Sequence, residues 1–167
     1  MLDIRIREYE PSDLEQCRTL WEELTHHHRH IYDDPSIGGD APGLYFDEYC
    51  NRTGLEKIWV VEHESTVIGL SGLIIQDAEA EVEPVVIKEN YRNQGIGRAL
   101  VNHIIQEAKK RNIRYLNVNP VARNVDALSF FHRQGFQTVG HIQLFIDLED
   151  SETWKSGIEI FDRSFKY

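Results

Sequence analysis

The spacing of hydrophobic residues changes early in the chain, from every second position to a helical period. Leu2, Ile4 and Ile6 alternate with charged residues, which predicts a strand with one buried face. Apolar residues after Pro11 recur three or four positions apart, which predicts a helix. They are Leu14, Cys17, Leu20, Trp21 and Leu24. Residues 33–43, rich in glycine and proline, follow as a predicted mobile loop.

The middle of the chain contains three strand patterns after one short helix. Residues 44–52 predict the helix. Residues 57–63 and 67–75 predict two strands that pair as a hairpin through Glu64 and Ser65, and residues 81–88 predict a third strand.

The C-terminal half alternates between helix and strand. Helices are predicted at 95–111 and 125–134, and strands at 114–118, 136–148 and 158–165. The two strand-helix-strand passages require parallel neighbours in the sheet. The chain is therefore expected to form a single domain, 1–167, of the α/β (α+β mixed) class, with a mixed sheet and about four helices.

Composition narrows the range of partners. The net charge is -10 and the sequence pI is about 5.2, so the field of the protein should repel nucleic acid and anionic lipid and suit a cationic partner. No stretch reaches the ~18 apolar residues of a membrane span. The two cysteines, Cys17 and Cys50, show no zinc-site spacing. We expect a cytoplasmic protein with neither nucleic acid nor membrane as a partner.

The most informative segment is Tyr91–Leu100, YRNQGIGRAL, between an apolar strand and an amphipathic helix. Gly95 and Gly97 allow a tight turn, and the first helical turn leaves N–H groups that suit phosphate. Arg92 and Arg98 could add positive charge at its rim. The alternative is that glycine serves only close packing. The segment lacks the Gly-Lys-Ser/Thr ending of a Walker turn, and Leu100 stands at the third glycine of a dinucleotide fingerprint.

Two motifs together resemble the GNAT superfamily of N-acetyltransferases. Arg92-Asn93-Gln94-Gly95-Ile96-Gly97 is similar to the Q/R-x-x-G-x-G/A signature, and Asn124 to Phe136 is similar to the second signature. The resemblance implies a central, mostly antiparallel sheet with a splayed parallel strand pair. It also implies acetyl-CoA as cosubstrate and transfer of its acetyl group to an amine.

The resemblance also implies which residues contact the coenzyme. Amides of the turn from Asn93 to Arg98 would hold the pyrophosphate, and the preceding strand would pair with the pantetheine arm. Asn124 would contact the coenzyme near the mouth of the splayed strands. The complete predicted set is Val85, Val86, Ile87, Arg92, Asn93, Gln94, Gly95, Ile96, Gly97, Arg98, Asn124 and Phe131.

Amine acetylation needs a base, because an ammonium has no lone pair. Glu79, Glu81 and Glu83 alternate along one predicted strand and share a face. The resemblance places a catalytic glutamate on this strand, which favours Glu83 as general base, with Glu81 as the second candidate. The alternative is that these side chains simply face solvent in an acidic protein.

One position departs from the family pattern. Phe131 stands where the second signature usually carries a tyrosine that protonates the departing thiolate, and phenylalanine cannot donate a proton. A water could supply that proton, or His132 or another tyrosine could. The remaining alternative is a non-catalytic acyl-CoA sensor or regulatory domain of the same fold. A nucleotide-binding protein of another fold is favoured only by the glycine turn.

The acceptor is left open as a small-molecule amine or a peptide or protein amine. The first helix and following loop would form its entrance, with histidines at 26, 27, 28 and 30 as a polar wall. His26 and His30 have the spacing of metal ligands, but no metal is predicted. Tyr32, Tyr45, Phe46 and Trp59 would form either an aromatic wall or ordinary core.

A homodimer through the last strands is also a prediction. The alternative is an intramolecular hairpin that the chain's own helices cover. The apolar residues of these strands are Phe145, Ile146, Ile158, Ile160, Phe161 and Phe165.

Overall fold

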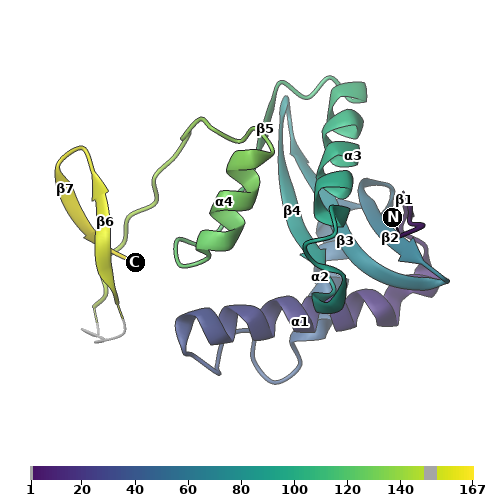
Figure 1. Ribbon diagram of the computed structural model, residues 1–167, viewed down its shortest axis with the longest axis horizontal. Helices are drawn as coiled ribbons and strands as arrows, with labels where there is room; N and C mark the ends of the chain where they lie inside the picture. Colours follow the sequence, from purple (N-terminus) through teal and green to yellow (C-terminus); the bar gives the residue numbers. More distant parts are fainter. Residues whose placement is uncertain (1, 149–153) are drawn as a thin grey trace. The chain divides into compact units, whose positions relative to one another are not determined.

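The computed structural model describes residues 2–148 and 154–167, and these form two compact units (Figure 1). The first unit is Met1–Asn119 and the second is Pro120–Tyr167. Each unit is described separately below. The single domain over 1–167 stays a prediction.

A five-stranded mixed sheet organises the first unit. Its strands lie in the order β1-β2-β3-β4-β5 (Figure 1). The three pairings from β1 to β4 are antiparallel, whereas β4 and β5 are parallel. The predicted mixed and mostly antiparallel sheet is therefore confirmed. The strands are β1 (Arg5–Glu8), β2 (Ile58–His63), β3 (Thr66–Gln76), β4 (Glu79–Ile87) and β5 (Tyr115–Asn117).

Four α-helices are present among the described residues, as the hydrophobic spacing predicts. They are α1 (Leu14–Tyr32), α2 (Tyr45–Thr53), α3 (Ile96–Lys110) and α4 (Val125–Arg133), the last in the second unit. Short 3-10 turns lie at Pro11–Asp13, Pro42–Leu44, Leu55–Lys57 and Glu89–Tyr91. None of the helices among the described residues is both long and apolar enough to cross a membrane.

The loop after α1 is tied to that helix. The Arg29 Nε donates to the Ile37 carbonyl at 2.8 Å, and its Nη2 donates to the Gly39 carbonyl at 2.5 Å. Asp33 ends the helix in the left-handed conformation, with φ of 54°. The segment predicted as a mobile loop is therefore anchored on both sides of its centre.

Helices cover both faces of the sheet. Ile58 and Val60 of β2 are fully buried and belong to a core cluster with Leu20 of α1 and Phe46 of α2. The intervening Trp59 points to the opposite face, where its ring lies 5.8 Å from that of His103 on α3. The helix α3 buries Ile96, Leu100, Val101, Ile104 and Ala108.

An ion pair joins β1 to the start of α1. The two terminal nitrogens of Arg7 donate to the Asp13 carboxylate at 2.7 and 2.8 Å, and the Arg7 Nε donates to Glu62 at 2.7 Å. Burial raises the pKa of the Asp13 carboxyl, but hydrogen bonds from Arg7 and from the Glu10 amide outweigh burial and hold that pKa below its usual value. Asp13 is therefore a charged group on which the strand–helix junction depends.

The second unit differs most from the sequence prediction. Residues 136–148, expected as a strand, have no regular secondary structure. Their apolar pattern suits a strand, but a strand needs a neighbour that accepts and donates its backbone hydrogen bonds. No strand among the described residues pairs with this segment, and the prediction of a strand there is wrong.

The single strand expected at 158–165 is also wrong, because a turn divides it. The observed strands are β6 (Ser156–Ile160) and β7 (Arg163–Lys166), which form a separate antiparallel pair. Phe161 and Asp162 have φ of 49° and 62° and form the two-residue turn. Aromatic residues rarely occupy such positions, so residue type did not indicate a turn at Phe161.

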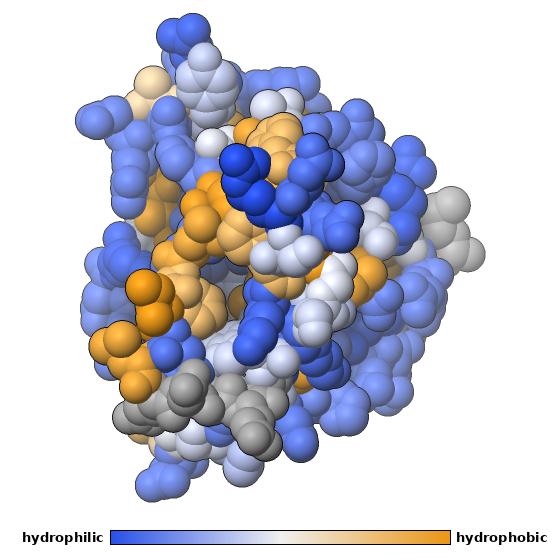
Figure 2. Space-filling model, turned by 90° about the vertical axis from the view of Figure 1, so that its left-hand side faces the viewer, coloured by the Kyte–Doolittle hydropathy of each residue, from blue (hydrophilic) through white to orange (hydrophobic). Residues whose placement is uncertain are grey.

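Apolar side chains of the second unit remain at its surface, and Figure 2 shows apolar surface, in orange, on one face of the molecule. The homodimer through the last strands stays a prediction. The large exposed apolar residues of this unit are Val125, Leu128, Val139, Ile142, Leu144, Phe145, Ile146, Leu148 and Phe161.

Replacement of Asp13 by Asn should lower the free energy of unfolding by on the order of 3 kcal/mol at pH 7, because Arg7 loses a charged partner in a largely buried site. The folded pKa of Asp13 lies below the unfolded value of about 3.9, so its contribution is present above that pH and is lost as pH falls through the folded pKa. Urea denaturation at pH 7 and pH 3 measures both effects.

The exposed Asp40 provides the matched control, and Asp40→Asn should change the stability little at either pH. A stability difference between wild type and Asp13→Asn that is the same at pH 7 and pH 3 would contradict this account of the ion pair.

Candidate functional site

The strand β4 is paired on one edge and largely open on the other. It pairs with β3 from Glu79 to Ile87, with an irregularity opposite Gly72. It pairs with β5 only at Glu79, Ala80 and Glu81. Beyond Glu81, the described residues provide no partner for this edge of β4. The parallel pair is therefore splayed, as the family resemblance implied.

The open edge carries backbone groups from two of the three predicted strand residues. The Lys88 amide donates to the Ile68 carbonyl on β3 at 2.9 Å, so the groups of Ile87 and Val85 point to the opposite edge. By the same alternation Val86 directs its backbone toward β3. The Ile87 carbonyl accepts from the Arg92 Nε at 2.9 Å. The remaining groups at Val85 and Ile87 suit an extended molecule with amide bonds.

The glycine turn follows this edge after the short 3-10 turn Glu89–Tyr91. Asn93 and Gly95 have φ of 60° and 82°, and α3 begins at Ile96. The first helical hydrogen bond runs from the Ala99 amide to the Gly95 carbonyl at 3.0 Å. The amides between them, from Ile96 to Arg98, have no acceptor within the helix. Such a turn at a helix N-terminus is suited to bind an anion.

The conformation of the turn, rather than lack of space, explains Gly95. A Cβ added to this residue would meet no atom within 4 Å, but its positive φ disfavours any side chain. The Ile96 side chain is 3% exposed and anchors the turn in the core, while Arg92 and Arg98 are exposed. The Gln94 side chain donates to the Asn90 carbonyl at 3.1 Å. The result is an ordered turn with accessible positive charge.

The side chains of Glu79, Glu81 and Glu83 lie on one face of β4, as their alternation in the sequence predicts. Glu79 is exposed, and Glu81 and Glu83 are partly buried. The Asn119 Nδ2 donates to Glu81 at 2.8 Å, and the Arg52 Nη2 donates to Glu83 at 3.2 Å. Neither partner belongs to the predicted set. They lie 38 and 31 residues away in sequence, and no short motif connects them to this strand.

Tyr49 of α2 holds the backbone of Glu83. Its hydroxyl donates to the Glu83 carbonyl. The side chain is buried, which raises the pKa of Tyr49 above its usual value and keeps the hydroxyl protonated as a donor. Gly72 of β3 leaves room for this hydroxyl, because an added Cβ would overlap it. Sequence reasoning missed Tyr49 because its spacing is that of an ordinary core residue.

The two predicted site residues of the second signature lie in the second unit. The Asn124 Oδ1 accepts from the Ala127 amide at 3.0 Å, which caps α4. The Phe131 ring packs edge-on against the rings of Phe130 and Phe136, with centroids 5.2 and 5.7 Å apart. Both contacts explain how these residues stabilise the local structure of α4, and their contact with a coenzyme stays a prediction.

The proposed acceptor wall is only partly exposed. His26 and His30 are exposed on α1, and His28 is partly buried, so that burial and then the neighbouring His27 lower its pKa. Across residues 2–148 and 154–167, no group of three metal-ligating side chains occurs. Phe46 and Trp59 are core residues, and Tyr45 is exposed. The aromatic wall is therefore ordinary core at two of its four positions.

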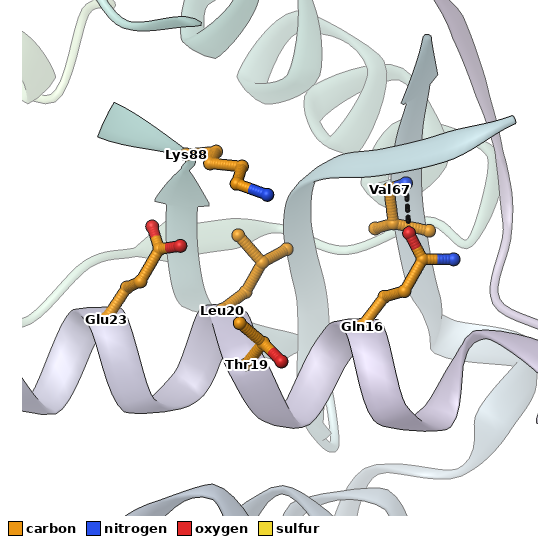
Figure 3. A pocket seen from close by; sticks show the side chains of 6 residues that line it. All are labelled: Gln16, Thr19, Leu20, Glu23, Val67 and Lys88. Carbon is orange, nitrogen blue, oxygen red and sulfur yellow. Dashed lines mark hydrogen bonds between the residues drawn. The ribbon is translucent and has the colours of Figure 1, made fainter. Parts of the chain in front are cut away.

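A small cavity lies between α1 and the ends of β3 and β4 (Figure 3). Its volume is about 90 Å³, which is below the roughly 300 Å³ of an ordinary ligand pocket. Glu23 and Lys88 extend toward the cavity from opposite sides (Figure 3). The cavity is therefore too small for a coenzyme-sized ligand.

Known proteins resemble this chain in part of their sequence. A stretch of 58 residues is 34% identical to the [ribosomal protein bS18]-alanine N-acetyltransferase of Escherichia coli and covers 35% of this chain and 39% of that enzyme. Another 58-residue match is 36% identical to an uncharacterised N-acetyltransferase of Methanocaldococcus jannaschii and covers 35% of this chain and 26% of that protein. The chain thus matches less than half the length of these two relatives.

Solved structures share the fold. A GNAT-family acetyltransferase from Staphylococcus aureus superposes with a TM-score of 0.67 at 18% identity, covering 98% of this chain and 97% of that one. The aminoglycoside N-acetyltransferase AAC(6')-Iy, in complex with CoA, superposes with a TM-score of 0.66 at 13% identity, covering 87% of this chain and 95% of that one.

The family assignment rests on most of the chain. The acetyltransferase (GNAT) family matches residues 17–136, which include the glycine turn, the β4 carboxylates and the second signature. The fold neighbours and the splayed parallel strands agree with that match. This chain belongs to the acetyltransferase (GNAT) family.

Proposed function

We propose that this protein is an acetyl-CoA-dependent N-acetyltransferase that acts on a primary amine. One observation carries the proposal: the open edge of β4 is followed, after the short 3-10 turn Glu89–Tyr91, by the glycine turn at the N-terminus of α3. A molecule with an amide-bearing arm and a pyrophosphate needs these two features in this order. Coenzyme A has this chemistry, and the fold neighbour AAC(6')-Iy is a CoA complex.

Different residues of the chain bind different parts of the coenzyme. The backbone groups of Val85 and Ile87 pair with the pantetheine amides, and the amides from Ile96 to Arg98 bind the pyrophosphate. Arg92 has a structural role as well, because its Nε already binds the Ile87 carbonyl. Arg98 is the exposed cation on the first turn of α3, so it contributes charge without a competing contact to the strand.

The thioester would lie beside the carboxylates of β4. Glu83 accepts a proton from the acceptor ammonium and leaves a neutral amine. The amine nitrogen forms a bond to the acetyl carbon, and the bond from that carbon to sulfur breaks. The second proton of the nitrogen passes to the departing sulfur, and Glu83 returns its own proton to solvent. Acetylated amine, free coenzyme A thiol and one released proton are the products.

Phe131 gives some weight to a second function. Its side chain has no proton to give, so water is the proposed carrier of the proton to the sulfur. A non-catalytic acyl-CoA sensor would also retain the open edge and the turn. We favour the enzyme because Glu81 and Glu83 are held by Asn119 and Arg52, which gives the face a defined arrangement of carboxylates.

The acceptor is proposed as a cationic amine, either small or at the start of a peptide. The net charge of -10 attracts cations and disfavours nucleic acid. The E. coli relative is named for the alanine of a ribosomal protein, and AAC(6')-Iy for aminoglycosides. A panel with an alanine-led peptide, spermidine and neamine covers these classes, and free thiol measured with acetyl-CoA reports turnover.

Reversal of charge at the turn should weaken the coenzyme site. Arg98→Glu places a carboxylate beside the proposed pyrophosphate position and should raise the dissociation constant of CoA about tenfold in calorimetry. Arg114→Glu is the matched control, because Arg114 is also exposed but precedes β5, at the opposite end of the parallel pair from the turn. Equal weakening by both substitutions would show that net charge alone governs binding.

Removal of the proposed base should slow the chemistry and leave coenzyme binding intact. Glu83→Gln should lower kcat about 100-fold, the range of a lost general base, with the CoA dissociation constant changed less than twofold. Glu79→Gln is the control, since Glu79 shares the face but lies where β5 still pairs with β4. A kcat for Glu83→Gln within a few-fold of wild type would reject Glu83 as the base.

A further inference from the structure

We propose that Arg52 is a positioning residue for Glu83, and that a cationic acceptor must displace its guanidinium to reach that carboxylate. This inference rests on the proposed function and deepens it. It explains how the site would bind a charged amine substrate in preference to its neutral acetylated product. Arg52 belongs to α2, which no motif connects to the chemistry.

Three contacts form a closed cluster around Glu83. Tyr49 binds the Glu83 carbonyl through its hydroxyl. Arg52 binds the Glu83 carboxylate, with its Nη2 3.2 Å from Oε1. The Arg52 guanidinium also lies over the Tyr49 ring, 6.0 Å from its centroid. One turn of α2 therefore holds both the backbone and the side chain of Glu83.

The hydrogen bond from Tyr49 and the ion pair with Arg52 differ in strength. Tyr49 is 2% exposed and packs in the core, so its bond to the backbone is a fixed part of the fold. The Arg52 side chain is 57% exposed and that of Glu83 is 38% exposed, so their ion pair lies in a region of high dielectric. The backbone of Glu83 stays in place while the guanidinium can leave at little cost.

Displacement of Arg52 follows from the charges on this face. The Glu81 carboxylate accepts a hydrogen bond from the neutral side-chain amide of Asn119, whereas the Glu83 carboxylate pairs with the cationic Arg52. An incoming ammonium competes with the guanidinium for the same oxygen. Once acetylated, the acceptor is neutral and cannot compete, so Arg52 pairs with Glu83 again and favours product release.

The kinetic consequence separates positioning from general structure. Without the guanidinium the ammonium has no competitor, so KM and the dissociation constant for a cationic acceptor should fall. The Glu83 side chain also loses the contact that fixes its rotamer, so kcat should fall as well. Damage to the fold would raise KM instead.

The test uses Arg52→Gln and Arg52→Lys with the full chain. The amine is the member of the panel (alanine-led peptide, spermidine or neamine) with the highest kcat/KM. For Arg52→Gln, KM should fall about threefold and kcat about threefold, as expected for loss of a largely exposed ion pair. Arg52→Lys retains a cation and should restore most of both constants. The exposed residue Arg114 supplies the control, Arg114→Gln.

Calorimetry of the same amine in the presence of CoA gives a second readout that does not need turnover. Arg52→Gln should bind the amine about threefold more tightly than wild type, and should have no effect in a Glu83→Gln background. Unchanged or weaker amine binding by Arg52→Gln would overturn the inference. Absence of thiol release by wild type with every amine would instead reject the transferase function, while amine affinities would still test Arg52.

Discussion

The short parallel pairing between β4 and β5 is the constraint on which the rest of the site depends. Only Glu79 to Glu81 pair with β5, so the edge of β4 from Val82 onward keeps unpaired backbone groups. Exposed sheet edges are normally a liability, and proteins protect them or use them to bind. Here a single 3-10 turn, Glu89–Tyr91, separates the open edge from the glycine turn that begins α3, so the strand edge and the helix N-terminus follow one another along the chain.

The other edge of β4 explains why the opening is stable. Pairing with β3 holds β4 on both sides of Glu83 and Pro84, which lie at the irregularity opposite Gly72, and there the Tyr49 hydroxyl donates to the Glu83 carbonyl. The backbone at Glu83 is therefore held by α2 and by the paired residues before and after it, while the β5 side stays open. A carboxylate on such a rigid element can be placed accurately beside a reacting group.

The sequence predicted the first unit well because its patterns are local. Strand-like apolar runs located β2, β3 and β4, and helical spacing located α1 and α3 within a few residues. The glycine turn was also readable, since the conformation at Gly95 depends on its own φ rather than on neighbours. These features need no knowledge of distant contacts.

Distant contacts account for what the sequence could not predict. Arg52 and Tyr49 reach Glu83 across more than 30 residues, and their residue types are unremarkable on a short helix. The error at residues 136–148 has a similar origin, because a strand pattern gives the apolar face but does not supply a pairing partner. In the turn at Phe161 and Asp162, aspartate is a usual residue for positive φ, but phenylalanine at the first position is not.

Amide hydrogen exchange with and without CoA tests the central claim most directly. Coenzyme that pairs with the open edge and the turn should slow exchange at Val85 and Ile87 and at the amides from Ile96 to Arg98. Val86, whose backbone faces β3, should change little. Protection that is confined to other parts of the chain, with these amides unchanged, would contradict the assignment of the open edge and the turn as the coenzyme site.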